Sequence, residues 1–287
     1  MTQDAIDKKR WIGMKMIRVF PRKTNATPTD DKVYFTGPPL WPLEDREVHV
    51  STTFTWDRAK AESLARQWEE QGYDVKVGGP AYGDVGGEFV GGRYVGGGYT
   101  ITSRGCNNKC WFCYVWKREG RLRELPIVDG YNILDSNLLG CSDDHIKSIF
   151  EMLGQQAEKP IFTGGLEAKL LKPWHVDLLK EYKTERMYFA YDTPDDYEPL
   201  VNATEMLFSG GFKPHDRKCC CYCLIGYPND TMEQAEKRLR DVYKLGLTPF
   251  AMLYRDYKGE YAQDWRQTQR QWARPIIIYG RKDLVNK

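Results

Sequence analysis

Apolar and polar positions in residues 48–77 follow the order strand, helix, strand. Residues 48–54 are rich in β-forming types, residues 57–71 carry apolar residues at helical spacing, and residues 73–77 are again strand-like. The apolar stripe of this helix consists of Ala59, Leu64, Ala65 and Trp68. Gly72 follows the last helical residue and ends the helix. The pattern predicts one βα unit of a parallel α/β fold.

From residue 98 onward, short β-rich runs alternate with amphipathic stretches. The predicted strands are residues 99–102, 131–134, 160–163, 186–191, 219–225 and 248–253. Ser142 and Gly154 mark the start and end of one helix, Pro173 begins a second, and a third covers about residues 230–245. Six alternating units predict a parallel sheet covered by helices.

Composition sets outer limits on the kind of protein. The 287 residues are 41% hydrophobic and 29% charged, with a formal net charge of +2, which fits one or two globular domains without a general attraction to nucleic acid. No apolar run approaches the roughly 20 residues that cross a bilayer. Residues 1–13 are charged and lack the apolar region of a signal peptide. We therefore expect a cytoplasmic protein without membrane association.

Three cysteines lie within eight residues, at Cys106, Cys110 and Cys113, in the spacing Cys-x3-Cys-x2-Cys. Zinc sites and closed iron–sulfur clusters normally take four protein ligands, so three cysteines imply a distant fourth ligand or an iron that binds another molecule. No His-x3-His stands at zinc spacing, and the other Cys-x-x-Cys, from Cys220 to Cys223, lies within a predicted strand. A disulfide would need an oxidising compartment. The spacing favours an iron–sulfur cluster, with zinc as the alternative.

This spacing, with Phe112 directly before the last cysteine, resembles the signature of the radical S-adenosylmethionine (radical SAM) superfamily. The resemblance implies an open (β/α)6 partial TIM barrel preceded by a short α/β segment. It also implies a [4Fe-4S] cluster on the three cysteines, whose open iron binds S-adenosylmethionine. The family cleaves this cofactor to a 5′-deoxyadenosyl radical that abstracts a hydrogen atom, using an external one-electron reductant of the flavodoxin or ferredoxin type.

Residues at the ends of the predicted strands would contact S-adenosylmethionine by the same resemblance. The run from Phe162 to Glu167 is similar to the family's Gly-Gly-Glu-Pro motif with one residue inserted. The implied cofactor contacts are Phe112, Gly164, Gly165, Glu167, Asp192, Ile225 and Met252. Glu167 would bind the methionine ammonium and Asp192 the ribose. Alternatively, the two carboxylates only start helices, and the apolar residues belong to the core.

The segments outside the predicted barrel define the remaining domains. Ten glycines between residues 78 and 98 indicate a flexible connector that also covers the active site. Near the C-terminus, Trp265 and Trp272 share one helical face, which predicts an amphipathic helix at the bottom of the barrel. The expected domains are 1–97 for the N-terminal segment with its connector, 98–256 for the barrel and 257–287 for a C-terminal helix and strand.

Two further features leave alternatives open. Cys219, Cys221 and Cys223 alternate along one strand, with Cys220 on its other face, and would form an auxiliary cluster, donate a hydrogen atom or pack as small apolar residues. The N-terminal βα unit resembles a remnant of a cobalamin-binding domain. It lacks the Asp-x-His-x-x-Gly motif, so we expect no bound cobalamin.

The resemblance implies an enzyme, and the width of a six-stranded partial barrel favours a macromolecular substrate, either a nucleic acid or a peptide. Substrate identity depends on loops, for which fold analogy gives little guidance. The alternative is a non-catalytic iron–sulfur protein that serves in electron transfer or as a scaffold.

Overall fold

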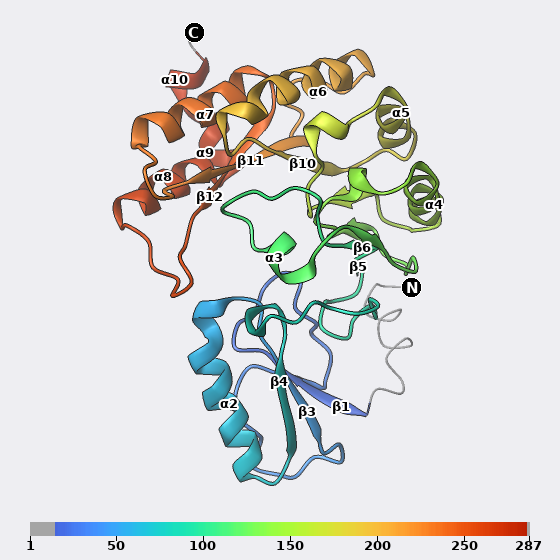
Figure 1. Cartoon of the computed structure of the whole chain (residues 1–287), viewed down its shortest axis with the longest axis vertical. Helices are drawn as coiled ribbons and strands as arrows, with labels where there is room; N and C mark the ends of the chain where they lie inside the picture. Colours follow the sequence, from blue (N-terminus) through green and yellow to red (C-terminus); the bar gives the residue numbers. More distant parts are fainter. Residues whose placement is uncertain (1–14, 286–287) are drawn as a thin grey trace. The chain divides into compact units, whose positions relative to one another are not determined.

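The computed structural model describes residues 15–285, and the chain divides into two compact units (Figure 1). The first unit ends at Gly130 and the second begins at Tyr131. The sequence analysis placed a boundary after residue 97 instead, ahead of the cysteine loop. This loop belongs to the first unit, where Arg104 and Arg123 at its base donate hydrogen bonds to backbone carbonyls of the glycine-rich segment.

The first unit is built on a four-stranded parallel sheet in the order β2-β1-β3-β4. Its strands are β1 (Met16–Val19), β2 (Val33–Tyr34), β3 (Glu47–Ser51) and β4 (Asp74–Gly78). Helix α2 (Arg58–Glu70) packs against this sheet, and its Trp68 shares a buried core with Ile17 and Val48. The predicted order of strand, helix and strand within residues 48–77 is confirmed.

Two details of the first unit differ from the prediction. Strands β1 and β2 were not predicted, because both are short and β2 lies among polar and turn-forming residues. The buried stripe of α2 consists of Ala61, Leu64, Ala65 and Trp68. These positions follow the helical spacing i, i+3, i+4, i+7. Ala59 lies off that stripe and is exposed, so its assignment to the buried face was wrong.

Short elements complete the first unit. They are the 3-10 turns η1 (Thr55–Asp57) and η2 (Pro80–Tyr82), strands β5 (Tyr99–Thr100), β6 (Ser103–Arg104) and β7 (Arg123–Glu124), and helix α3 (Val115–Glu119). Strands β6 and β7 pair antiparallel. The cysteine loop is therefore the connection of a β-hairpin and does not follow directly from the predicted strand at residues 99–102.

The second unit contains a parallel sheet in which each strand lies beside the preceding one. Its strands are β8 (Asn132–Ile133), β9 (Ile161–Phe162), β10 (Arg186–Ala190), β11 (Cys219–Ile225) and β12 (Thr248–Leu253). The order β8-β9-β10-β11-β12 and the parallel pairing match the predicted strands of residues 131–253. Both units are thus α/β with parallel sheets.

Helices connect the strands of the second unit and follow one another in an arc outside them (Figure 1). They are α4 (Asp143–Gly154), α5 (Pro173–Glu181), α6 (Tyr197–Ser209) and α7 (Met232–Lys244). The Ser142 hydroxyl caps α4 by accepting from the His145 amide, as predicted. The sequence analysis assigned no helix to α6. No helix of the part that the structure describes is long and apolar enough to cross a bilayer.

The C-terminal segment forms α8 (Asp264–Trp272), α9 (Pro275–Tyr279) and α10 (Lys282–Val285). Trp265 and Trp272 are both buried, so the predicted amphipathic helix is confirmed. Its predicted place at the bottom of the barrel was wrong. Trp265 packs on Gly226 at the carboxyl end of β11, whereas the Tyr279 hydroxyl bonds to Thr248 at the amino end of β12. The segment therefore runs back along the sheet.

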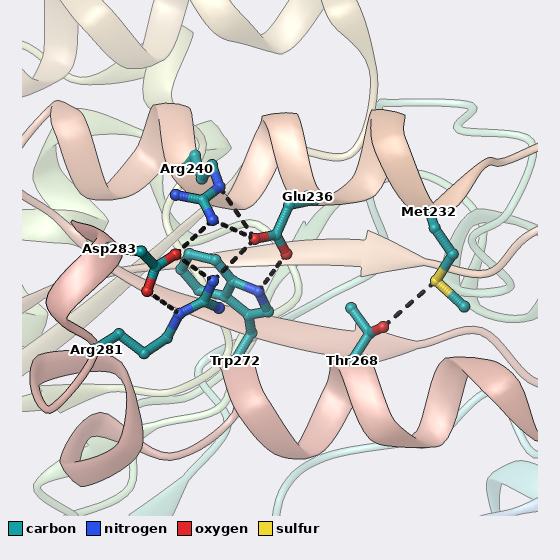
Figure 2. A network of polar contacts seen from close by, with 7 residues as sticks. All are labelled: Met232, Glu236, Arg240, Thr268, Trp272, Arg281 and Asp283. Atoms are coloured by element: carbon teal, nitrogen blue, oxygen red, sulfur yellow. Dashed lines mark hydrogen bonds and ion pairs between the residues drawn. The ribbon is translucent and has the colours of Figure 1, made fainter. Parts of the chain in front are cut away.

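A polar network fastens this segment to α7 (Figure 2). The Trp272 indole N–H donates to Glu236 at 2.6 Å, and the Arg281 guanidinium pairs with the same carboxylate at 3.0 Å. Arg240 bridges Glu236 and Asp283. A buried indole needs a hydrogen-bond acceptor, and α7 supplies one beside the sheet.

Candidate functional site

The cysteine loop of the first unit spans residues 105–122 between β6 and β7. Gly105 begins it with φ +82°, and a methyl group there would lie 2.3 Å from the carbonyl oxygen of Arg121. Only glycine fits such a conformation and such a close approach without strain. The Cys106 amide donates to the Gly120 carbonyl at 3.2 Å. The two ends of the loop are therefore held close together.

The buried side chain of Glu119 stabilises the base of this loop. Its carboxylate accepts a hydrogen bond from the Gly105 amide at 2.9 Å. Arg104 and Arg118 form ion pairs with the same carboxylate. A buried carboxylate is stable only when it is paired in this way. Sequence reasoning missed Glu119, because it lies in a run of ordinary charged residues with no motif of its own.

Within the loop, backbone groups surround the three cysteines. The Asn108 amide donates to the Sγ of Cys106 at 3.4 Å, and Cys110 accepts at its carbonyl from the Cys113 amide and the Trp116 indole. Cys106 and Cys113 are half-buried, and Cys110 is exposed. Hydrogen bonds from amides to thiolate sulfur tune iron–sulfur sites. The donor set therefore suits an iron–sulfur cluster.

The thiols do not converge on one point in this structure. Among residues 15–285, no group of three or more His, Cys, Asp or Glu side chains is gathered closely enough to hold a metal ion. Three cysteines on one eight-residue stretch nevertheless have the chemistry and reach for a single cluster. The fit to a cluster thus rests on the donor set and the fixed base of the loop.

A cavity of about 500 Å³ opens beside Cys106. Its lining consists of Cys106, Asn107, Lys109, Trp116, Gly120 and Arg121. Lys109 and Arg121 make this lining cationic, which favours an anionic occupant. Phe112 is not part of the lining and instead packs edge-to-face on Trp111, with ring centres 5.3 Å apart.

Part of the glycine-rich segment is held against the hairpin that carries the cysteines. Arg123 donates to the carbonyls of Val85 and Gly86, and Arg104 donates to the carbonyl of Gly87. Gly86 adopts φ +66°, and a methyl group there would lie 2.5 Å from the Arg104 guanidinium carbon. This stretch of glycines therefore has a packing role in addition to any flexibility.

In the second unit, the Gly-Gly-Leu-Glu run follows β9 at the carboxyl edge of the sheet. Gly164 presses on the end of β8, where a methyl group would lie 2.2 Å from the Asp135 carbonyl, and Gly165 adopts φ +100°. Glu167 does not cap the short turn that follows, and its Oε2 accepts from the Asn137 amide at 2.7 Å. Glu167 thus stands at the start of the 3-10 turn η4 (Ala168–Leu170), but its side chain bonds to Asn137 and does not cap that turn. Asn137 was missed because it lies one strand away.

Asp192 joins the carboxyl ends of two strands. It follows β10, and its Oδ1 accepts from the Leu224 amide of β11 at 2.7 Å. Burial raises the pKa of Asp192 to about 6. One oxygen of this carboxylate therefore links the ends of β10 and β11.

The apolar residues expected near adenine separate onto two faces of the sheet. Ile225 is fully buried with Cys221 and Cys223, whereas Leu224 pairs in register with Met252 on the other face. Met252 is 43% exposed. The side chain of Ile225 therefore belongs to the core, whereas Leu224 lies on the same face as Met252.

The face of the sheet that carries Leu224 and Met252 also carries aromatic rings that were not predicted as site residues. Tyr188 and Tyr222 stack with ring centres 4.4 Å apart, and both meet Phe250 edge-on. Offset and edge-to-face pairs of this kind stabilise neighbouring strands. The available signal was an aromatic residue in each of three neighbouring predicted strands, at positions 188, 222 and 250.

The remaining cysteines of β11 are buried. Burial raises the pKa of the Cys220 thiol to about 11 and that of Cys221 well above its usual range. Thiols that stay protonated at neutral pH are poor metal ligands. This arrangement favours the interpretation of Cys219, Cys221 and Cys223 as small core residues.

Comparison of the chain with known proteins adds no assignment to this geometry. No protein-family model matches the sequence, and no curated protein matches it.

Proposed function

We propose that this protein is a radical SAM enzyme. The observation that carries the proposal is the cysteine loop, in which three cysteines lie within eight residues, Glu119 stabilises the base, and a cationic cavity opens beside Cys106. When bound there, a [4Fe-4S] cluster with S-adenosylmethionine would supply one-electron cleavage of the cofactor and a radical that abstracts a hydrogen atom. The loop would bring its three sulfurs together as the cluster binds.

Residues of the chain take distinct roles in this proposal. Cys106, Cys110 and Cys113 hold the cluster, and the Asn108 amide stabilises the negative charge on the Cys106 sulfur. Glu167 binds the methionine ammonium, and Asp192 binds the ribose. The sequential strand order of the second unit is the order of an open partial barrel, which supports the finer fold assignment.

The proposal includes a macromolecular substrate and an external one-electron reductant. Trp111 and Tyr114, on the cysteine loop, are 52% and 61% exposed. Exposed aromatic side chains of this size are enriched in contacts with partner molecules. Their place beside the cluster ligands supports docking of a partner at this loop.

The direct test of the function is cofactor cleavage by the full chain. After anaerobic reconstitution with iron and sulfide, the protein should bind about four irons and, with dithionite and S-adenosylmethionine, release 5′-deoxyadenosine. Chromatography of the quenched reaction measures this product. Four bound irons without 5′-deoxyadenosine would indicate a non-catalytic iron–sulfur protein, and retention of zinc in place of iron would contradict the cluster itself.

The role of Glu167 makes a separate prediction. Glu167→Gln should weaken S-adenosylmethionine binding by about 1.5–3 kcal/mol, roughly ten- to a hundredfold, because a charge-assisted hydrogen bond to the ammonium is lost. Calorimetric titration of the reconstituted protein measures the change, and iron content should stay at the parent level.

Glu181→Gln is the matched control for this prediction. It makes the same substitution at the exposed last residue of α5. Binding should not change in this variant. Equal affinities of both variants and the parent would show that Glu167 serves only its hydrogen bond with Asn137.

A further inference from the structure

A second cavity, of about 540 Å³, lies at the carboxyl edge of the sheet in the first unit. Its lining consists of Pro21, Arg22, Lys23, Phe35, Asp57 and Lys60. Arg22 and Lys23 follow β1, Phe35 follows β2, and Asp57 and Lys60 lie at the start of α2. Three connections that are separate in sequence therefore meet at one hollow.

The strand order places this cavity at a reversal of the chain's direction across the sheet. From β1 the chain passes to β2 on one side, and from β3 it passes to β4 on the other. In open parallel sheets, ligands bind outside the carboxyl ends of the strands at such a point, because the diverging connections leave a crevice. A volume of several hundred cubic ångströms matches small-molecule sites.

The lining carries three cationic side chains and one carboxylate. Both oxygens of Asp57 are engaged by Arg22, at 2.8 Å from Nε and 2.8 Å from the terminal nitrogen, so this pair is internally neutralised. Within residues 15–285, neither Lys23 nor Lys60 pairs with a carboxylate. Their charge is therefore available to an anion.

Lys60 is held in place at the cavity. Its ammonium donates to the Pro21 carbonyl at 2.6 Å, which uses one of its three N–H groups. The remaining two can donate to a ligand. Asp57 makes no side-chain cap on α2, and both of its oxygens accept from Arg22.

Phe35 provides a flat apolar surface next to these charges. Its ring is half-buried, and the Lys23 ammonium lies over the ring, 5.9 Å from its centre, so a base stacked here would lie beside this charge. Aromatic rings stack on nucleobases irrespective of base identity. The cavity therefore combines donors for phosphate with a platform for a base.

We propose that this cavity binds a nucleotide, with its phosphates at Lys23 and Lys60 and its base on Phe35. S-adenosylmethionine carries no phosphate, so this ligand is distinct from the cofactor proposed above. The nucleotide site involves no cysteine, and it stands whether or not the chain binds a cluster.

Calorimetric titration of the full chain with ADP at low ionic strength tests the proposal. We expect one ADP per chain, weaker binding of inorganic pyrophosphate and adenosine, and loss of affinity as salt screens the charges. Lys23→Gln and Lys60→Gln should each weaken ADP binding about tenfold, as expected for a charge-assisted contact. Lys23 is exposed, so its replacement preserves folding.

Arg66→Gln is the matched control, since it removes a positive charge from an exposed position of α2 outside the cavity lining. Its ADP affinity should equal that of the parent. Absence of ADP binding at millimolar concentration would overturn the proposal. So would an affinity unchanged by Lys23→Gln and Lys60→Gln, or pyrophosphate binding as tightly as ADP.

Discussion

Each of the single variants Cys106→Ala, Cys110→Ala and Cys113→Ala should lose the absorption near 400 nm after reconstitution. Each should also release no 5′-deoxyadenosine. Two thiolates cannot retain a cluster that the chain holds with three. Iron analysis and absorption spectra of the three single variants measure this loss. The effect is complete rather than graded, because cofactor cleavage requires the cluster.

Cys221→Ala and Cys223→Ala are the matched controls. Both cysteines are buried in β11 and lie outside the cysteine loop. These variants should keep about four irons and cleave the cofactor. Eight irons in the parent with four in either control would establish an auxiliary cluster on β11. Full iron content in any of the three loop variants would contradict the proposed ligand set.

Trp272→Ala should lower the free energy of unfolding by about 3–5 kcal/mol, the range observed when a large buried aromatic side chain is truncated. Trp272 is 0% exposed, and its indole joins α8 to Glu236 of α7. The truncation leaves a cavity between the C-terminal segment and α7. Urea denaturation followed by circular dichroism measures the change.

Two comparison variants separate packing from hydrogen bonding at this position. Trp272→Phe keeps most of the apolar contact and loses only the bond to Glu236, so its cost should be smaller, about 1–2 kcal/mol. Ile276→Ala alters an 80% exposed side chain of α9 and should change stability by less than about 0.5 kcal/mol. If Trp272→Ala were as mild as Ile276→Ala, α8 would contribute little to the second unit.

Several elements followed from local sequence patterns. The strands between residues 131 and 253 and the limits of α4 were predictable because hydrophobic periodicity, a capping serine and a terminal glycine act over a few residues. The spacing of Cys106, Cys110 and Cys113 is likewise a property of eight consecutive residues. Local information was enough for each of these.

Strand β11 shows where such patterns lose their information. Its run Cys-Cys-Cys-Tyr-Cys-Leu-Ile is apolar at nearly every position, so no alternation separates the covered face from the open one. Ile225 was therefore predicted as a cofactor contact, whereas the sheet buries Ile225 and leaves Leu224 on the face that carries Met252.

The sequence alone determined the α/β class of both units, the strands of the second unit with three of the four helices that connect them, and the spacing of the three cysteines. Only the tertiary structure decided that Glu119 locks Gly105, that Asn137 holds Glu167 and that Pro21, Phe35 and Lys60 line one cavity. The physical reason is the distance along the chain over which each interaction acts. Periodicity and caps arise between neighbours in the chain, whereas buried ion pairs and cavities arise where separate connections meet at the edge of a sheet.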